Sequence, residues 1–379
     1  MISAHRQNNF DLIRLLAAAQ VVVAHAIGHT ALKDQLPAWG RQIFEALMMV
    51  PGVPVFFVIS GFLIAKSYER NPTDLAGYFW RRGLRIFPAL WICLFFTLVT
   101  LAAFGFLGTD FVLTKTFVAW LVGQLSFFQF YNPEHFRGFG IGVVNGALWT
   151  ITVELQFYVL IPILHFLTCG ARSGTKLAGA IMAFLFFASF AAFCVMDHQV
   201  NGPGGFTGAP MLFKLLHMTL IPHLWMFLLG IFIHRKFAAL ESWIEGKVIY
   251  YLLAFVIFTG LQGAFIDGRS VPFYLAYLPS RILLAFATLA GAYSFRPLSQ
   301  WLLRGTDISY GIYIYHSVVI NVMVQLGLMT SMRSVAAVYA ISIVAALLSW
   351  HCVEKPALAC KSVSPRVLWN RLAGLKHSS

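Results

Sequence analysis

Apolar residues recur along this chain in uninterrupted runs of roughly 18 to 20, long enough for helices that cross the hydrocarbon core of a bilayer. A transmembrane barrel would instead show segments of about ten residues with alternating polarity. The pattern predicts an all-α polytopic membrane protein with about ten transmembrane helices. The expected spans are residues 10–28, 48–66, 88–108, 148–168, 177–196, 217–234, 248–266, 276–294, 307–326 and 334–353.

Composition narrows the class of protein further. The 379 residues are 59% hydrophobic and 11% charged, which excludes an ordinary soluble domain. The five cysteines lack CxxC or Cys/His spacing, so neither a disulfide framework nor a metal site is indicated. The first apolar run is long and contains Arg14, which favours an uncleaved span over a signal peptide. The net charge of +13 collects in short loops between spans, so we expect no nucleic acid partner.

Residues 117–131 are the ambiguous apolar segment, because it is short for a span and contains two glutamines and a serine. With ten spans and both termini cytoplasmic, most of the 27 Lys and Arg residues fall on the cytoplasmic side. An eleventh span here would reverse every later loop, against the positive-inside rule. We therefore expect the segment to be re-entrant or to lie along the outer surface. Residues 1–357 are then the membrane-embedded domain and residues 358–379 a basic cytoplasmic tail.

The first span carries two polar groups that a bilayer does not favour. Arg14 and His25 are 11 residues apart, which places them on one helix face and about 16 Å apart along the axis. Asp11 lies three residues before Arg14, at the spacing of an ion pair. One interpretation is structural, with Arg14 paired to Asp11 and His25 in interfacial water. The other is a functional pair along one face of the helix.

Two further stretches combine polar residues with apolar surroundings. Arg81, Arg82 and Arg85 cluster where the third span begins; guanidinium groups suit phosphates, although cytoplasmic loops carry arginine in any case. The second span contains Ser60 and Gly61, for which we favour a close helix contact that depends on glycine, with Ser60 in a supporting role.

Three polar residues in later spans complete the candidate set. Glu154 lies two turns inside the fourth span, where an ionised carboxylate is costly and needs a partner, so it is a functional candidate. The ninth span opens with "TDISYGIYIYH", which places Tyr310 near its start and His316 at mid-depth. For His316 we favour a satisfied core histidine, and we assign both residues a supporting role.

Taken together, these motifs resemble a known family. The order of R-x10-H, "FFVISGFLI", "RRGLRIFP", "LWTITVELQFY", "ISYGIYIYH" and "SWHCVEKP" is similar to that of the acyltransferase-3 membrane proteins. The resemblance implies ten spans, acyl-coenzyme A (acyl-CoA) as cytoplasmic donor, and a glycan or glycolipid acceptor outside. Arg14 and His25 match the family's essential pair, and Arg81, Arg82 and Arg85 match its arginine motif. Leu155 stands where members often carry a second acidic residue. The short tail predicts a stand-alone form without an appended esterase-like domain.

A mechanism follows as a hypothesis. Arg81, Arg82, Arg85 and Arg14 would bind the phosphates of acyl-CoA, acetyl-CoA in the first instance, without a metal. His25 would then remove the proton of a sugar hydroxyl or accept the acyl group itself, and Glu154 would orient the imidazole. The expected location is the bacterial cytoplasmic membrane, with membrane lipid as a further partner. A transporter or flippase of a small solute or lipid-linked carrier is the alternative function, and a structural or sensory protein that binds anionic lipid is a third.

Overall fold

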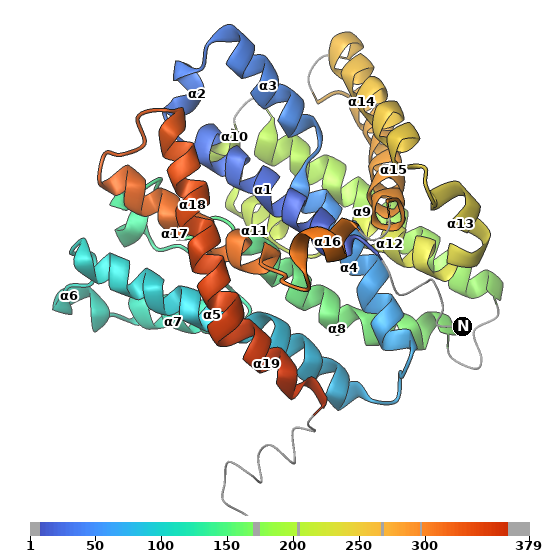
Figure 1. The fold of residues 1–379 in the computed structure, drawn as a ribbon, viewed down its shortest axis with the longest axis horizontal. Coiled ribbons are helices and arrows are strands. Elements are labelled where there is room, and N and C mark those ends of the chain that lie inside the picture. The colour runs from blue at the N-terminus through green and yellow to red at the C-terminus, as the bar shows by residue number, and fades with distance from the viewer. Residues whose placement is uncertain (1–7, 170–174, 203–204, 267–268, 296–297, 363–379) are drawn as a thin grey trace, which may run out of the picture.

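The chain folds into a bundle of tilted helices (Figure 1). The structure, a computed structural model, describes residues 8–169, 175–202, 205–266, 269–295 and 298–362. Within these ranges every regular element is a helix and no strand is present, which confirms the predicted all-α class. Most of the predicted basic tail, residues 363–379, lies outside the described residues.

Eight stretches of the described chain are long and apolar enough to cross a membrane. They are α1 (Phe10–Gly28), α3 with α4 (Ala38–Met49 and Gly52–Glu69), α5 (Leu75–Ala103), α8 (Trp149–Cys169), α9 (Thr175–Asn201), α14 (Val248–Phe265), α15 (Val271–Tyr293) and α18 with its extension to α19 (Met332–Ser349 and Lys355–Ala359). The other two predicted spans correspond to shorter helices, α12 (Leu224–Arg235) and α17 (Ser309–Gln325). The described residues therefore contain eight helices that qualify as spans, fewer than the ten predicted.

Two predicted boundaries differ because local signals outweigh hydropathy. The third helix, α5, begins at Leu75, well before the expected residue 88, because Asp74 caps it by accepting a hydrogen bond from the Gly77 N–H at 2.9 Å. The arginine cluster is therefore helical. The expected span 217–234 is broken into α11 (Met211–His217) and α12 around Pro222, since proline lacks the backbone N–H that a continuous helix needs.

The ambiguous segment 117–131 does not span. It forms α7 (Lys115–Leu125), whose 11 residues cover only about 16 Å. One face of α7 buries Phe117 and Trp120 in a second core cluster that also contains Phe136 and Phe139.

After α7 the chain forms a short 3₁₀ helix, Glu134–Gly138, and then enters the protein interior without regular structure before α8 begins. Asn145 Nδ2 donates to the Ile314 carbonyl of α17 at 2.9 Å, and the Gly146 N–H donates to Ser317 Oγ at 3.1 Å. Irregular backbone at this position is tolerated because protein groups satisfy its polar atoms. α8 consequently starts in the interior of the bundle, and its residue Tyr158 accepts, through its carbonyl, a hydrogen bond from the Tyr78 hydroxyl near the start of α5.

Close packing fixes the helices around the interior. At the crossing of α4 and α12, a Cβ on Gly61 would lie 2.1 Å from the Phe227 carbonyl oxygen, and one on Gly230 would lie 2.2 Å from that of Val58. Only glycine permits this approach of two backbones. The expectation that Gly61 serves a close helix contact is confirmed. The remaining short α-helices are α2 (Leu32–Gln35), α6 (Thr109–Val112), α10 (Gly205–Gly208), α13 (Phe237–Ile244) and α16 (Leu298–Leu303).

Candidate active site

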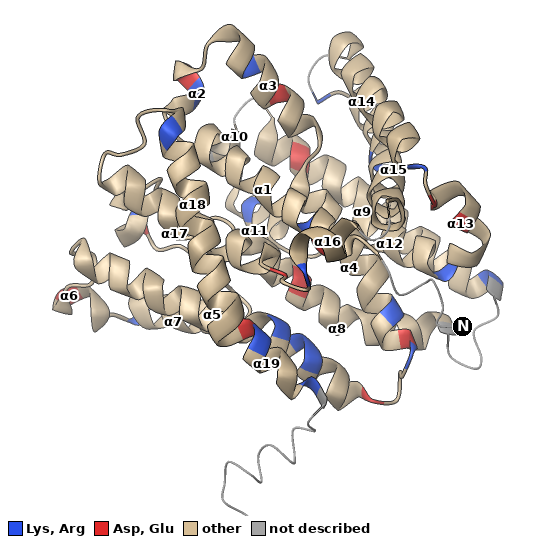
Figure 2. Cartoon of the chain, in the orientation of Figure 1, with Lys and Arg blue, Asp and Glu red and all other residues tan. Residues whose placement is uncertain are grey.

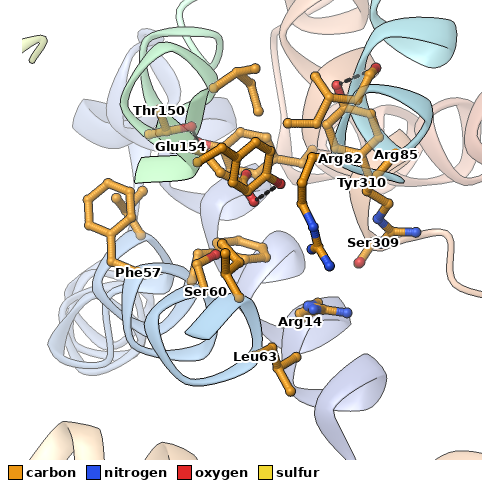
Figure 3. A pocket seen from close by; sticks show the side chains of 17 residues that line it. Arg14, Phe57, Ser60, Leu63, Arg82, Arg85, Thr150, Glu154, Ser309 and Tyr310 are labelled. Atoms are coloured by element: carbon orange, nitrogen blue, oxygen red, sulfur yellow. Dashed lines mark hydrogen bonds between the residues drawn. The ribbon is translucent and has the colours of Figure 1, made fainter. Parts of the chain in front are cut away.

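A cavity opens between five helices, α1, α4, α5, α8 and α17 (Figure 3). We call it the central cavity. Apolar side chains and polar groups both line it, and the polar groups converge on one space, as they do in ligand sites. Its polar lining residues are Arg14, Ser60, Arg82, Arg85, Thr150, Glu154, Tyr158, Ser309, Tyr310 and Tyr313.

One acidic residue holds two of the cavity's three arginines. Asp307 Oδ2 lies 2.5 Å from Arg85 Nη2 and 3.8 Å from Arg14 Nη1. Its other oxygen, Oδ1, accepts a hydrogen bond from the Ser309 hydroxyl, with 2.6 Å between the oxygens. Arg14 also forms the expected ion pair with Asp11, at 3.1 Å. The side chain of Asp307 is only 10% exposed, so these contacts compensate a carboxylate that burial would otherwise disfavour. Two guanidinium groups are thereby fixed at this end of the cavity.

Arg82 differs from its neighbours because no carboxylate among the described residues pairs with it. Its Nη2 donates to Ser67 Oγ at 3.1 Å, its guanidinium lies 5.7 Å from the ring centre of Tyr158, and its buried Nε has no hydrogen-bond partner in the described part of the chain. Figure 3 shows the guanidinium groups of Arg82 and Arg14 directed into the same space from different helices. Partial burial, with the positive charges of Arg85 and Arg82, lowers the pKa of Lys361 beyond the last helix. This end of the cavity therefore offers uncompensated positive charge to an anion.

Glu154 lies in this charged part of the cavity. Its Oε1 accepts a hydrogen bond from the Tyr158 hydroxyl at 2.7 Å. The sequence placed Glu154 in the outer half of its helix, near His25, on the assumption that each span starts at the membrane surface. Because α8 starts in the interior of the bundle, Glu154 lies among the arginines instead, and no hydrogen bond links it to His25.

His25 instead contacts His316. His25 Nδ1 lies 2.9 Å from His316 Nε2, and His316 Nδ1 lies 3.1 Å from the Ile312 carbonyl oxygen in α17. His316 is fully buried, and the ring of His29 packs edge-on against the ring of His25 at 5.1 Å between centres. Neither His25 nor His316 lines the central cavity.

Tyr313 links the cavity to the histidine pair. Tyr313 forms part of the cavity lining, and its ring centre lies 6.0 Å from that of His316. Its hydroxyl is 2.6 Å from Thr150 Oγ1, which joins α17 to the first turn of α8. Tyr313 is therefore a hydrogen-bonded lining residue of the cavity that also contacts His316.

The structure divides the predicted site residues into groups. Arg14, Ser60, Arg82, Arg85, Glu154 and Tyr310 line one cavity. Arg81 does not line it, because its guanidinium pairs with Asp74 at 2.9 Å. The Tyr310 hydroxyl donates to the Ile86 carbonyl at 3.1 Å, which ties α17 to α5.

Sequence reasoning did not select Asp307, Tyr158 or Tyr313 as site residues. Asp307 opens the ninth predicted span, and an acidic residue next to an apolar span is itself a signal that a buried cation needs a partner. Nothing in the local sequence distinguishes Tyr313 from the other tyrosines of its motif, because its position depends on how α8 and α17 meet.

The arrangement supports group transfer between two environments. One end presents arginine to an anion, the lining accommodates a slender apolar or amide chain, and an imidazole lies beyond Tyr313. Imidazole is the side chain best suited to exchange a proton near neutral pH or to act as a nucleophile.

Comparison with known proteins is consistent with this chemistry. The chain is 32% identical over 374 residues to Nodulation protein 10 of Rhizobium leguminosarum bv. viciae, covering 95% of each chain. It is 29% identical to the O-acetyl transferase of Shigella phage Sf6, covering 94% of this chain and 98% of that one. It is also 26% identical to the peptidoglycan O-acetyltransferase OatA of Listeria monocytogenes, over 80% of this chain and 50% of the relative. No solved structure matches the chain.

The family description "Acyltransferase domain" of the acyltransferase-3 group matches residues 7–353, which include every element that lines the central cavity. This match extends over nearly the whole chain and agrees with the two relatives named as O-acetyltransferases. The protein is therefore a multi-pass membrane acyltransferase that belongs to the acyltransferase-3 family.

Proposed function

We propose that this protein transfers an acyl group, acetyl in the first instance, from cytoplasmic acyl-CoA to a hydroxyl of an extracytoplasmic glycan or glycolipid. The observation that carries the proposal is the continuous arrangement from Arg82, through the central cavity, to Tyr313 beside His316 and His25. Residues 1–357 would be the membrane-embedded catalytic unit, surrounded by lipid in a bacterial cytoplasmic membrane. The family membership favours acyl transfer over a transporter or flippase.

Donor binding would begin at the arginine end. Arg82 has guanidinium hydrogens free for phosphate oxygens, and arginine matches phosphate with a planar fork. Arg14 and Arg85 contribute positive potential while Asp307 holds them in place. The thin pantetheine arm would follow the apolar lining, and its length is of the same order as the ~16 Å between Arg14 and His25 along α1. The thioester would reach His25 when the Tyr313 ring turns away from Thr150.

Two routes of transfer are open at His25. As a general base, its Nε2 takes the proton of the acceptor hydroxyl while the oxygen attacks the thioester carbonyl carbon. The C–S bond then breaks, and the coenzyme A thiolate takes the proton from the imidazolium and leaves as the thiol. As a nucleophile, Nε2 first forms the bond to the acyl carbon and the thiolate leaves; the acceptor oxygen then displaces the imidazole, and the hydroxyl proton passes to the thiolate. Both routes require a ring nitrogen that carries no hydrogen and faces the thioester.

Glu154 takes a different proposed role from the one that the sequence indicated. Glu154 accepts a hydrogen bond from Tyr158, and the guanidinium of Arg82 lies over the ring of Tyr158. Glu154 would therefore position the donor-binding arginine through Tyr158. Both termini and the arginines would lie on the cytoplasmic side. The acceptor would approach from the opposite face of the membrane. The name of the Listeria relative, which specifies peptidoglycan, supports a glycan as acceptor class.

Mass spectrometry of surface glycans tests the proposal. Cells that produce the protein should carry glycans heavier by one acetyl group, and cells that produce His25→Ala should not. His165→Phe is the control. His165 lies in α8, packs against Tyr68 and does not line the cavity. Unchanged acylation in His25→Ala cells would remove His25 from the reaction, and identical glycans with and without the protein would refute the acceptor class.

A further inference from the structure

The relation between His25 and His316 carries an inference about which ring nitrogen reacts. The carbonyl oxygen of Ile312 can only accept a hydrogen bond, so the hydrogen of the 3.1 Å contact must be on His316 Nδ1. A neutral imidazole carries one ring hydrogen, which leaves His316 Nε2 bare. The 2.9 Å contact between the rings then requires the hydrogen on His25 Nδ1, which donates to His316 Nε2. This leaves Nε2 of His25 without a hydrogen.

We infer that His316 is a positioning residue that holds His25 in the tautomer with a bare, reactive Nε2. The two hydrogen bonds point the same way: His25 donates to His316, and His316 donates to the Ile312 carbonyl. A second charge on His316 is disfavoured because the residue has 0% exposed surface. His316 therefore remains an acceptor while His25 gains and loses a proton.

The arrangement replaces the carboxylate that orients histidine in many hydrolases. A carboxylate would both fix the tautomer and attract the imidazolium cation, whereas a neutral ring backed by a carbonyl fixes the tautomer alone. The backbone of α17 supplies this anchor, since Ile312 lies four residues before His316 and its carbonyl accepts from Nδ1 on the same helix face. Both routes of acyl transfer need the bare Nε2 that results.

The tautomer itself does not depend on the proposed function, although its kinetic consequence rests on that function. Two measurements therefore separate them. The first is ¹⁵N NMR of the purified full-length protein labelled in its histidine rings, in which the coupling to the ring protons distinguishes Nδ1 from Nε2. The His25 signals are identified by their loss in His25→Ala. The second is the rate of acyl transfer from acetyl-CoA in membranes.

We expect wild-type His25 to show a protonated Nδ1 and a bare Nε2. In His316→Phe, which keeps a ring but removes the acceptor, both tautomers should be populated, and kcat should fall by about 100-fold with KM for acetyl-CoA unchanged. His316→Gln places a carbonyl oxygen near the position of Nε2 and should restore most of the rate. His165→Phe should change neither readout.

A wild-type His25 protonated at Nε2 would overturn the inference, as would an unchanged kcat in folded His316→Phe. If both His316 variants fail to fold, the wild-type spectrum alone decides. If the wild-type protein transfers no acetyl group while the spectrum shows the bare Nε2, the proposed function fails and the positioning role of His316 in that tautomer stands.

Discussion

The two ends of the candidate site, the arginines of the central cavity and the histidine pair beyond it, keep polar groups inside a membrane protein by opposite means. At the arginine end, Asp307 compensates Arg14 and Arg85 with ion pairs of 3.8 and 2.5 Å. At the histidine end, His25 and His316 lie 2.9 Å apart with a backbone carbonyl behind them and no charged partner in the contact chain. In Figure 2, blue residues gather along the first part of α5 and beside α19.

The difference shows which property each end needs. Arg14 and Arg85 are already paired with Asp307. Arg82 is therefore the arginine of the cavity that is free to bind an anion. A reacting imidazole needs a defined proton position more than a compensating charge, and neutral hydrogen bonds supply it. Changes at the charged end should therefore act on stability and donor affinity, and changes at the neutral end on the rate of transfer.

Removing the counter-ion is expected to have the largest effect on stability. Asp307→Asn keeps the shape of the side chain but leaves Arg85 without its ion-pair partner and Arg14 with Asp11 alone, at a cost of about 3–5 kcal/mol in unfolding free energy. We expect a large loss of folded protein and a lower melting temperature in detergent. A variant that unfolds like the wild type would show that solvent, rather than Asp307, compensates these arginines.

Changing the free arginine should weaken donor binding and leave the fold intact. Arg82→Ala removes charge-assisted hydrogen bonds worth about 1.5–3 kcal/mol, so the affinity for acetyl-CoA should fall roughly 10- to 100-fold. Arg82→Lys should restore part of it, because lysine lacks the planar fork. Arg81→Ala is the control, since Arg81 pairs with Asp74 outside the cavity. Equal losses in both alanine variants would mean that the arginines act only through general charge.

The irregular segment before α8 is anchored to α17 by a hydrogen bond from the Asn145 amide to a backbone carbonyl. Asn145→Ala leaves the Ile314 carbonyl without this donor, so we expect about 1–3 kcal/mol of destabilisation in thermal unfolding. Affinity for acetyl-CoA measured by calorimetry should stay unchanged, because the residue does not line the cavity. A loss of affinity equal to that of Arg82→Ala would show that donor affinity is not specific to the arginine end.

The smallest effect is expected at the surface ion pair between Asp74 and Arg81. Hydrogen bonds from Arg81 and from the Gly77 N–H lower the pKa of this carboxyl below its usual range, so its contribution is present above the ordinary aspartate value and is lost as the pH falls below it. Asp74→Asn keeps the cap acceptor. Its melting temperature should match the wild type near neutral pH, and a drop like that of Asp307→Asn would contradict the comparison.

Hydropathy was sufficient for the class of fold because each apolar run must bury its backbone polar groups in a helix. It placed α1 within the correct bounds and identified Gly61 as a contact residue. It failed where tertiary contacts move an element along the membrane normal. The descent of the chain before α8 rests on hydrogen bonds from Asn145 and Gly146 to α17, which no local pattern reveals.

The candidate site was predictable to the extent that helix geometry fixes it. Arg14 and His25 share a face of one helix, and the ion pair with Asp11 follows from their spacing. Contacts between helices were not predictable in the same way. His316 meets His25, and Glu154 meets Tyr158, because α17 packs on α1 while α8 begins in the interior, and both facts depend on the whole bundle.

Sealed membrane vesicles of known orientation test the central claim of transfer across the membrane. Inverted vesicles, which expose the cytoplasmic face, are given acetyl-CoA labelled in its acetyl group, and label in enclosed glycan or glycolipid is measured. We predict incorporation by inverted vesicles, none by right-side-out vesicles until they are permeabilised, and none by His25→Ala in either. Equal incorporation by intact vesicles of both orientations, or a fully active His25→Ala, would contradict donor entry from the arginine side and transfer at His25.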